Sequence, residues 1–282
     1  MKRMTKGLAA VILLAVPLAA CGDSGTDQAE TSRWDEIKEE GTLTVGTAGT
    51  LYPASFREEE SDDLTGFDVE VMKEIGKRLD LEVQFKEMAF DNMLTSVQNG
   101  QVDVVANDIS VTEDRKEKFA FSVPYKHTYG TAIVRKSDLS GIKSLEDLKG
   151  KKAAGEATTV FMDVARQYGA EEVIYDNATN DQYLRDVSTG RTDVILNDYY
   201  LQTLALAFFP EFDIAIHPDI AYNPQDVAFL MNKDNSELQE NIDRVLEEML
   251  EDGTVKQLSE QFYNGADVSV EPDVDATIVE LD

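Results

Sequence analysis

Apolar and polar positions in the first third of the chain alternate in blocks that are typical of strands and helices in turn. Val71, Met72 and Ile75 fall on one face of an amphipathic helix, whereas the neighbouring blocks are short and strand-like. Strands that alternate with helices favour βαβ units and a parallel sheet. The predicted elements are strand Thr42–Gly46, helix Leu64–Leu79, strand Glu82–Glu87, helix Asp91–Gln98 and strand Val102–Ala106.

The same alternation resumes further along and ends in a segment that has no counterpart in this second block. We therefore place the closing segment back on the first lobe, so that the chain crosses twice between two lobes. The predicted elements are strand Thr131–Arg135, a short helix capped by Ser144 and ended by Gly150, an alternating block over 152–218, strand Val227–Met231, helix Ser236–Glu251 and a last helix that reaches Tyr263.

One pattern, V-x-x-G-x-x-D-V-x-x-N-D, occurs twice, at 97–108 and again at 187–198. In both copies a Gly ends a helix, an apolar run follows, and an Asn-Asp pair closes the strand. Ligands of open parallel sheets bind beyond the carboxyl ends of the strands. The repeat therefore predicts two similar α/β lobes that present these pairs to a shared cleft, and chance similarity is the alternative. Asp103 and Asp193 are expected to serve the turns before the strands.

The charge of the chain limits its partners. Its 282 residues include 26 basic and 55 acidic ones, a formal net charge of −29. Nucleic acid and anionic membrane surfaces are poor partners for such a protein. The acidity fits a cationic ligand or, more simply, a solvated surface. One cysteine excludes a disulfide, and the scattered His127 and His217 are expected to be structural, so no cofactor and no metal site is predicted.

The N-terminus has the features of an export signal. An apolar run, Leu8–Leu18, follows three basic residues and is too short to span a bilayer. Its end, Leu18-Ala19-Ala20-Cys21-Gly22, resembles the lipobox of bacterial lipoproteins, which implies cleavage before Cys21 and lipidation of its thiol. A plain secreted protein with a free thiol is the alternative. The expected terminal segments are a signal peptide over 1–20, the lipidated cysteine with a flexible tether over 21–40, and an acidic disordered tail over 264–282.

Three stretches, GFDVEV at 66–71, SVTEDR at 110–115 and FSVPY at 121–125, resemble the successive signatures of family 3 extracellular solute-binding proteins. These are the amino-acid receptors of ABC importers. The resemblance runs from Gly41 to Tyr263 and implies an α/β, periplasmic-binding-protein-like type II fold with a two-crossing hinge. It also implies a monomer that works outside the cytoplasm and delivers its ligand to a permease with an ATPase. The implied parts are lobe 1 over 41–127 and 227–263, and lobe 2 over 128–226.

The resemblance also implies binding residues for an L-amino acid. Arg115, with Ser110 beside it, matches the group that grips the α-carboxylate, and a guanidinium suits a carboxylate because it donates two parallel hydrogen bonds. Ser110 is also expected to cap the following helix. Asp198 matches the acidic partner of the α-ammonium. The remaining matches are Thr158 and Thr159 for the carboxylate and Phe90 for the ligand side chain. The alternatives are a surface arginine for Arg115, helix caps for Asp198 and the threonines, and core packing for Phe90.

The sequence departs from the family pattern at two places. Tyr52, in Leu51-Tyr52-Pro53-Ala54, stands one position away from the usual aromatic. Asn107 and Asp108 replace small residues and look closer to the branch that includes cystine and other sulfur amino-acid receptors. Asp108 is expected to read the ligand or to act as a cap.

Closure of the lobes over the ligand is the implied mechanism, with hinges near Lys126–Thr131 and Pro224–Ala228. Arg115 and Ser110 bind first, and Asp198 and Thr159 join on closure. An enzyme of the same fold, a dehydratase or lyase that uses Asp108 and Asp198 as acid and base, is one rival. A sensory ligand-binding module is another.

Overall fold

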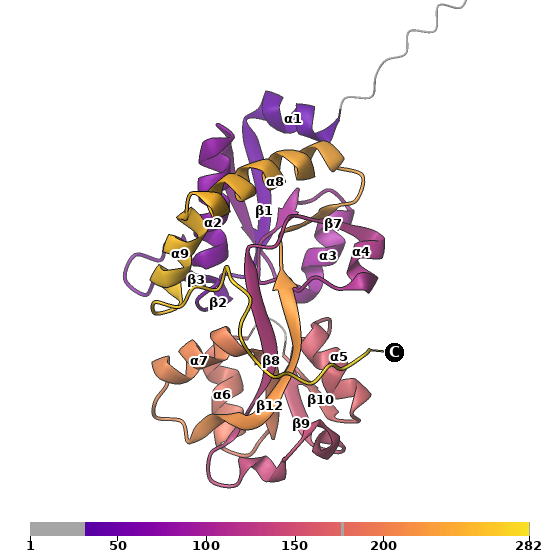
Figure 1. Cartoon of the computed structure of the whole chain (residues 1–282), viewed down its shortest axis with the longest axis vertical. Coiled ribbons are helices and arrows are strands. Elements are labelled where there is room, and N and C mark those ends of the chain that lie inside the picture. Colours follow the sequence, from indigo (N-terminus) through magenta and orange to yellow (C-terminus); the bar gives the residue numbers. More distant parts are fainter. Residues whose placement is uncertain (1–31, 176–177, 282) are drawn as a thin grey trace, which may run out of the picture. The chain divides into compact units, whose positions relative to one another are not determined.

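The computed structural model describes residues 32–175 and 178–281. Strands within this part form two five-stranded sheets and one small three-stranded sheet. Each large sheet carries its own helices (Figure 1), and we call the two bodies lobe 1 and lobe 2. The strands of lobe 1 are β1 (Thr42–Thr47), β5 (Glu82–Glu87), β6 (Val104–Val105), β7 (Phe119–Phe121) and β13 (Leu230–Asn232), and those of lobe 2 are β8 (Lys126–Arg135), β9 (Lys152–Gly155), β10 (Glu171–Ile174), β11 (Val194–Asp198) and β12 (Ile214–Val227). The small sheet consists of β2 (Thr50–Leu51), β3 (Ser55–Arg57) and β4 (Leu64–Thr65).

Helices cover both sheets. Lobe 1 has α1 (Arg33–Glu40), α2 (Phe67–Arg78), α3 (Phe90–Gln98), α4 (Glu113–Lys118), α8 (Ser236–Glu251) and α9 (Thr254–Phe262). Lobe 2 has α5 (Val160–Gln167), α6 (Asn180–Ser188), α7 (Tyr199–Phe208) and the 3₁₀ turns Leu139–Gly141 and Leu145–Leu148. The apolar face predicted for α8 is fully buried, because Ile242, Val245 and Leu246 pack into the core of lobe 1.

The two large sheets have the same strand order and the same strand directions. In lobe 1 the order is β5-β1-β6-β13-β7, and in lobe 2 it is β10-β9-β11-β8-β12. In each sheet the first three strands are parallel and the last two run antiparallel to their neighbours. The prediction of two similar α/β lobes is confirmed, and so is the parallel arrangement of the first three predicted strands, whereas the antiparallel strands that complete each sheet were not expected. The antiparallel strands are the ones contributed by the chain as it passes between lobes.

The repeated sequence pattern lies at equivalent places in the two sheets. In the first copy Gly100 follows α3 with φ +68° and leads to β6, and in the second Gly190 follows α6 with φ +74° and leads to β11. Glycine suits both positions because a left-handed backbone costs a residue without a Cβ little. The two copies therefore form the same helix, turn and central strand of each lobe.

Two adjacent strands connect the lobes. β8 and β12 run antiparallel, with Lys126 paired to Val227 at the lobe 1 end and Thr131 paired to Ala221 further along. Figure 1 shows both strands extending from lobe 2 towards lobe 1. The sequence placed the start of the first of these strands at Thr131, but pairing with β12 begins five residues earlier, at Lys126.

The C-terminal segment 264–281 packs against the molecule, so the expectation of a disordered tail over 264–282 is wrong for the described residues. Val268 is fully buried in the core of lobe 1, and its carbonyl oxygen accepts a hydrogen bond of 2.7 Å from the His127 amide. Val279 is buried in the core of lobe 2, and Thr277 forms a β-bridge with Tyr222. The segment therefore makes a third connection between the lobes, visible as the yellow trace in Figure 1.

The tether predicted over 21–40 is likewise too long. Residues 33–40 form α1, whose N-cap Ser32 accepts a hydrogen bond from the Asp35 amide and whose Ile37 is fully buried in lobe 1. The apolar residue Ile37 gives this short helix a packing partner, which a solvated tether lacks. Cys21 and the predicted signal peptide lie outside the described residues.

Helix α2 begins later than predicted. Residues 64–65 pair with β3 as a strand, and the helix starts after Gly66, whose φ is 129°. A Cβ on Gly66 would lie 2.3 Å from the Ala54 carbonyl oxygen, so the chain approaches the small sheet too closely for any other residue. Pairing within the small sheet thus overrides the helical pattern there.

Candidate functional site

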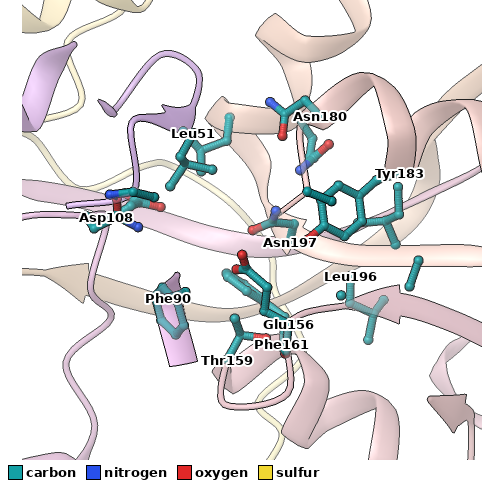
Figure 2. A pocket seen from close by; sticks show the side chains of 18 of the residues that line it. Leu51, Phe90, Asp108, Glu156, Thr159, Phe161, Asn180, Tyr183, Leu196 and Asn197 are labelled. Atoms are coloured by element: carbon teal, nitrogen blue, oxygen red, sulfur yellow. Dashed lines mark hydrogen bonds between the residues drawn. The ribbon is translucent and has the colours of Figure 1, made fainter. Parts of the chain in front are cut away.

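A pocket lies between residues of the two lobes and encloses about 850 Å³, part of it open to solvent. Figure 2 shows Leu51, Phe90 and Asp108 on one side and Asn180, Tyr183 and Asn197 on the other. The charged residues among its described lining are Arg115, Asp108 and Glu156, and further polar lining residues are Asn107, Ser110, Thr159, Gln202 and Thr50.

Arg115 is a pocket residue with a buried guanidinium. It sits in the first turn of α4, where its amide donates to the N-cap hydroxyl of Thr112, and it is 8% exposed. Nη1 donates to the Ser110 carbonyl oxygen at 2.9 Å, and Nη2 donates to the Thr158 carbonyl oxygen of lobe 2 at 3.0 Å. Burial lowers the pKa of Arg115, and the charge of Asp163 opposes this shift. An arginine stays charged in any case, so the pocket wall carries a buried cation whose described hydrogen bonds go to carbonyl oxygens.

Ser110 lines the same pocket but does not cap α4, which corrects the capping expectation. The N-cap is Thr112, two residues later. Ser110 instead forms a β-bridge with Val227, which holds its backbone against the second crossing strand. Its carbonyl oxygen is thereby positioned to orient the Arg115 guanidinium.

Asn107 and Asp108 play different parts at the end of β6. Asn107 is 2% exposed, and its Oδ1 accepts hydrogen bonds from the Ala48 amide at 2.8 Å and the Thr47 hydroxyl at 3.2 Å, so it holds the end of β1. Asp108 has a left-handed backbone, φ 53°, and its amide donates to Asp68 Oδ2. This turn directs the Asp108 carboxylate towards the crossing strand, where Oδ1 lies 2.6 Å from Lys126 Nζ.

Lys126 is the buried residue that the sequence analysis missed. It is fully buried at the start of β8, and its ammonium lies 2.6 Å from Asp108 Oδ1 and 3.0 Å from Asp198 Oδ2. Burial acts to lower the pKa of Lys126, but the two carboxylates outweigh it and raise the pKa well above the ordinary value. A lysine directly after Pro124-Tyr125, at the start of the crossing strand, was the available sequence signal.

Burial also raises the pKa of the neighbouring carboxyl groups. The pKa of Asp108 rises to about 6, because burial and the charge of Asp198 outweigh Lys126. The pKa of Asp68 rises to about 7, chiefly through burial and then through the charge of Asp108. Three carboxyl groups therefore surround one ammonium in this cluster, and the cluster lies where both lobes meet the crossing strands.

Asp198 differs from its expected position. It is the N-cap of α7, as the alternative interpretation predicted, with Oδ1 accepting a hydrogen bond of 2.8 Å from the Leu201 amide. Oδ2 faces Lys126, the residue is fully buried, and Asp198 is not among the described residues that line the pocket. The structure thus turns this carboxylate towards an internal cation.

The two threonines are separated by the structure. Thr159 lines the pocket and is the N-cap of α5, where its hydroxyl accepts from the Met162 amide at 3.2 Å. Thr158 lies at the rim instead: its amide and hydroxyl donate to Asp91 Oδ1 at 3.0 and 2.6 Å. Thr158 reaches the candidate site only through its carbonyl oxygen, which accepts from Arg115.

The two predicted aromatics also diverge. Phe90 lines the pocket and is 8% exposed, packed on the same core as Met93 and Val97. The Tyr52 ring packs on Phe56 and Phe208, with centroids 4.9 and 5.5 Å away, and in the described part of the chain it does not line the pocket. Its neighbour Leu51 takes that place. On the lobe 2 wall, Thr159 and Asn197 of the repeated Asn-Asp pair were anticipated from the sequence, whereas Glu156, Phe161, Asn180 and Tyr183 were not.

Within residues 32–175 and 178–281, no three His, Cys, Asp or Glu side chains are arranged to hold a metal ion. Each histidine has a partner in the fold: His127 Nδ1 lies 2.7 Å from Asp226 Oδ1, and His217 Nε2 lies 3.0 Å from the Ile142 carbonyl oxygen. None of the described helices is both long enough and apolar enough to span a membrane.

Comparisons with known proteins agree over nearly the whole chain. Residues 43–265 match the model of the bacterial extracellular solute-binding proteins, family 3. The chain is 60% identical over 266 residues to the probable ABC transporter extracellular-binding protein YckB of Bacillus subtilis, covering 94% of this chain and 93% of that protein. It is 35% identical over 277 residues to the L-cystine-binding protein TcyA of the same organism, covering 95% and 100%. The crystal structure of a mutant of ArgBP from T. maritima has a TM-score of 0.75 at 30% identity and covers 82% of this chain and 98% of that one.

Proposed function

The chain belongs to family 3 of the bacterial extracellular solute-binding proteins, and we propose that it captures an L-amino acid in its pocket and delivers it to a membrane permease. Its fold is the periplasmic-binding-protein-like type II fold. The relatives are binding proteins of transporters, not enzymes, and the family works outside the cytoplasm. The ligand, its contacts and the membrane anchor are proposals.

The buried guanidinium of Arg115 carries the proposal. A cation that is 8% exposed, lines the pocket and donates its described hydrogen bonds to carbonyl oxygens has the right environment for an anionic ligand group. Low local dielectric strengthens such an ion pair, and the planar guanidinium matches a carboxylate. We assign the α-carboxylate of the amino acid to Arg115, with the hydroxyl groups of Ser110 and Thr159 beside it.

The remaining lining suggests a polar ligand of moderate length. Phe90 and Phe161 supply flat apolar surface, whereas Asn180, Asn197 and Glu156 supply polar groups on the lobe 2 wall. A pocket of this kind suits a side chain that is apolar in the middle and polar at its end. Because TcyA is named as an L-cystine-binding protein, L-cystine is the first ligand to test.

Closure of the lobes is the proposed binding step. Hydrogen bonds already join the lobes at three places: Arg115 to Thr158, Thr158 to Asp91, and Asn180 Nδ2 to the Tyr52 carbonyl oxygen at 3.4 Å. The ligand adds to these contacts when it bridges the walls. To move the population from 1:99 to 99:1, it must favour the closed form by about 5.5 kcal/mol. Charge-assisted hydrogen bonds of roughly 1.5–3 kcal/mol each supply this with two to four contacts.

The geometry argues against the rival hypothesis of an enzyme that uses Asp108 and Asp198 as acid and base. Asp108 and Asp198 both pair with the Lys126 ammonium, so they share one internal cation. A general acid and base need access to the reacting group, and Asp198 is fully buried and turned away from the pocket. Binding without chemistry therefore fits the site better than a dehydratase or lyase reaction.

We further propose that Cys21, after removal of the signal peptide over 1–20, is lipidated and anchors the protein at the membrane. The anchored protein acts as a monomer and meets the permease and ATPase subunits of its transporter. The sensory alternative uses the same pocket, and stimulation of ATPase activity by the liganded protein in permease-containing vesicles distinguishes transport from sensing.

A thermal-shift screen of the twenty amino acids and L-cystine tests the function. A ligand at 100 times its Kd stabilises the folded state by about 2.7 kcal/mol, which raises Tm by roughly 5–10 °C for a domain of this size. Arg115→Ala should abolish the shift and the binding seen by calorimetry. Arg244→Ala is the matched control, because that arginine is 55% exposed on α8 and pairs with Glu248 at the surface. Micromolar binding by Arg115→Ala, or the absence of any shift in the screen, contradicts the proposal.

A further inference from the structure

We propose that Lys126 is a specificity-determining residue. Its ammonium pairs with the Asp198 carboxylate, so that Asp108 alone binds the α-ammonium of the ligand. This inference rests on the proposed function, since it concerns how an amino acid is held in the same pocket. It replaces the family expectation for Asp198, in which that carboxylate meets the ligand directly.

The position of Lys126 makes it a fixed part of the site. It is the first residue of β8, it pairs with Val227 of β12, and its side chain is fully buried. The ammonium also lies 5.2 Å from the centre of the Tyr263 ring, which adds a cation–π contact. The charge of Lys126 is therefore compensated inside the fold by two carboxylates and an aromatic face.

Both carboxylate oxygens of Asp198 face internal groups rather than the pocket. Oδ1 accepts the Leu201 amide as the cap of α7, and Oδ2 lies 3.0 Å from Lys126 Nζ. Its side chain is 1% exposed. To contact a ligand, Asp198 would have to lose either the hydrogen bond from the Leu201 amide or the ion pair with Lys126. Either loss is costly because these groups are buried.

Asp108 is placed to serve Lys126 and a ligand together. Oδ1 takes the lysine at 2.6 Å, while the residue lines the pocket beside Leu51, as Figure 2 shows. An ionised carboxylate has about four acceptor sites, so Oδ2 and the free lone pair of Oδ1 can accept a second ammonium. The left-handed turn at Asp108 and the hydrogen bond from its amide to Asp68 fix this orientation.

The charges favour one added cation. Asp108 and Asp198 both pair with the single ammonium of Lys126, so these three groups together carry one negative charge when both carboxyl groups are ionised. The ammonium of an amino acid neutralises that charge without removing an existing contact. An analogue that lacks the ammonium leaves it unpaired, so the site discriminates against such analogues.

The ligand arm of the test compares L-cystine with 3,3′-dithiodipropionate, the same molecule without its amino groups. In wild-type protein the analogue should bind at least about tenfold more weakly. Asp108→Asn should largely remove this preference, whereas Asp198→Asn should keep it within about threefold of wild type. Glu156→Gln, which alters the other acidic lining residue, should shift both affinities in parallel. Loss of the preference in Asp198→Asn or in Glu156→Gln, with Asp108→Asn still discriminating, overturns the inference.

A ligand-free arm separates this inference from the proposed function. Lys126→Met, Asp198→Asn and the double variant form a double-mutant cycle in urea unfolding, in which a coupled pair gives a non-additive result. If Lys126→Met does not fold, the ¹⁵Nζ signal of Lys126 replaces it, and Asp198→Asn should shift that signal. Additive variants, or an unmoved signal, overturn the pairing. Failure of wild type to bind any amino acid refutes the function instead, and the cycle then decides the lysine–aspartate pairing by itself.

Discussion

Asp103 and Asp193 make the same contacts in the two lobes. Asp103 Oδ2 accepts the Thr44 amide of β1 at 2.9 Å, and Asp193 Oδ2 accepts the Lys152 amide of β9 at 3.0 Å. The backbone amide of each aspartate donates back to the carbonyl oxygen of that same strand residue, at 2.8 Å in both lobes. Each carboxylate also pairs with an arginine, Arg33 or Arg135. The repeated aspartate therefore ties the central strand of each lobe to its parallel neighbour.

We expect Asp103→Ala to destabilise the protein more than Asp193→Ala. The Asp103 side chain is 3% exposed and that of Asp193 is 24% exposed, so solvent replaces the lost contacts less well in lobe 1. The cost should be about 2–3 kcal/mol for Asp103 and about 1 kcal/mol for Asp193. Urea unfolding measures both, with Glu113→Ala, whose side chain is 89% exposed, as the control. Equal costs at the two positions would argue against this burial account.

Removing the rim contact of Asp91 should weaken ligand binding without touching the pocket lining. Asp91→Ala loses both hydrogen bonds to Thr158, which join α3 of lobe 1 to the loop before α5. Since these bonds exist only when the lobes approach, we expect affinity to fall about three- to tenfold. Calorimetry measures the affinity. Glu113→Ala is the control, because it also removes one acidic charge from the surface of lobe 1 and should leave the affinity unchanged. An unchanged affinity in Asp91→Ala would show that the rim bonds form equally in the open state.

Stability should fall as pH rises from about 4 to about 7, and Asp68 is a principal cause. The pKa of Asp68 is raised to about 7, whereas an unfolded aspartate titrates near 3.9. The native state therefore binds more protons in this window, so its extra stability is complete below about pH 4 and is lost as pH passes through 7. Asp68→Asn removes the titrating carboxyl group and should therefore flatten the dependence of stability on pH.

Thermal denaturation between pH 4.5 and 8 measures this effect. Asp62→Asn is the control, because its carboxylate is 85% exposed and should follow wild type. If wild type and Asp68→Asn show parallel curves, Asp68 does not titrate in this range.

The C-terminal segment should contribute to the stability of lobe 2. Val279 is 7% exposed in the core of that lobe, whereas its neighbour Ile278 is 69% exposed. Val279→Ala should lower the free energy of unfolding by about 1 kcal/mol and Tm by roughly 2–4 °C. Ile278→Ala should have little effect. Equal effects of the two substitutions would mean that the segment is not packed in solution.

Periodicity predicted most of the elements because the apolar positions of strands and helices face one core. Glu82–Glu87 and Ser236–Glu251 have the predicted bounds, since each is a regular block ended by residues that break the pattern. The repeat at 97–108 also marked the equivalent helix, turn and strand of the two lobes. The antiparallel direction of β8 and β13 was not predicted, because their partners lie far away in the sequence.

The candidate site was predicted less completely, since much of it depends on packing across the lobes. Arg115, Ser110, Asp108, Asn107, Thr159 and Phe90 line the pocket as the motif suggested. Asp198 does not, because Lys126 lies 72 positions earlier in the chain and only the fold brings their charges together. Tyr52 turns away because its ring packs on Phe56 and Phe208, a contact that no local pattern encodes.

The C-terminal segment places the two ends of the described chain on different lobes. The described chain begins next to α1, whose Ile37 is buried in lobe 1. It ends beside lobe 2, where the Glu280 carbonyl oxygen accepts a hydrogen bond from Gln167. A donor dye at Glu39 would therefore be attached to lobe 1, and an acceptor dye at Glu280 would lie on lobe 2. Energy transfer between them would report the change in their separation as the bodies move, which makes this protein a ready scaffold for an optical sensor of its own ligand.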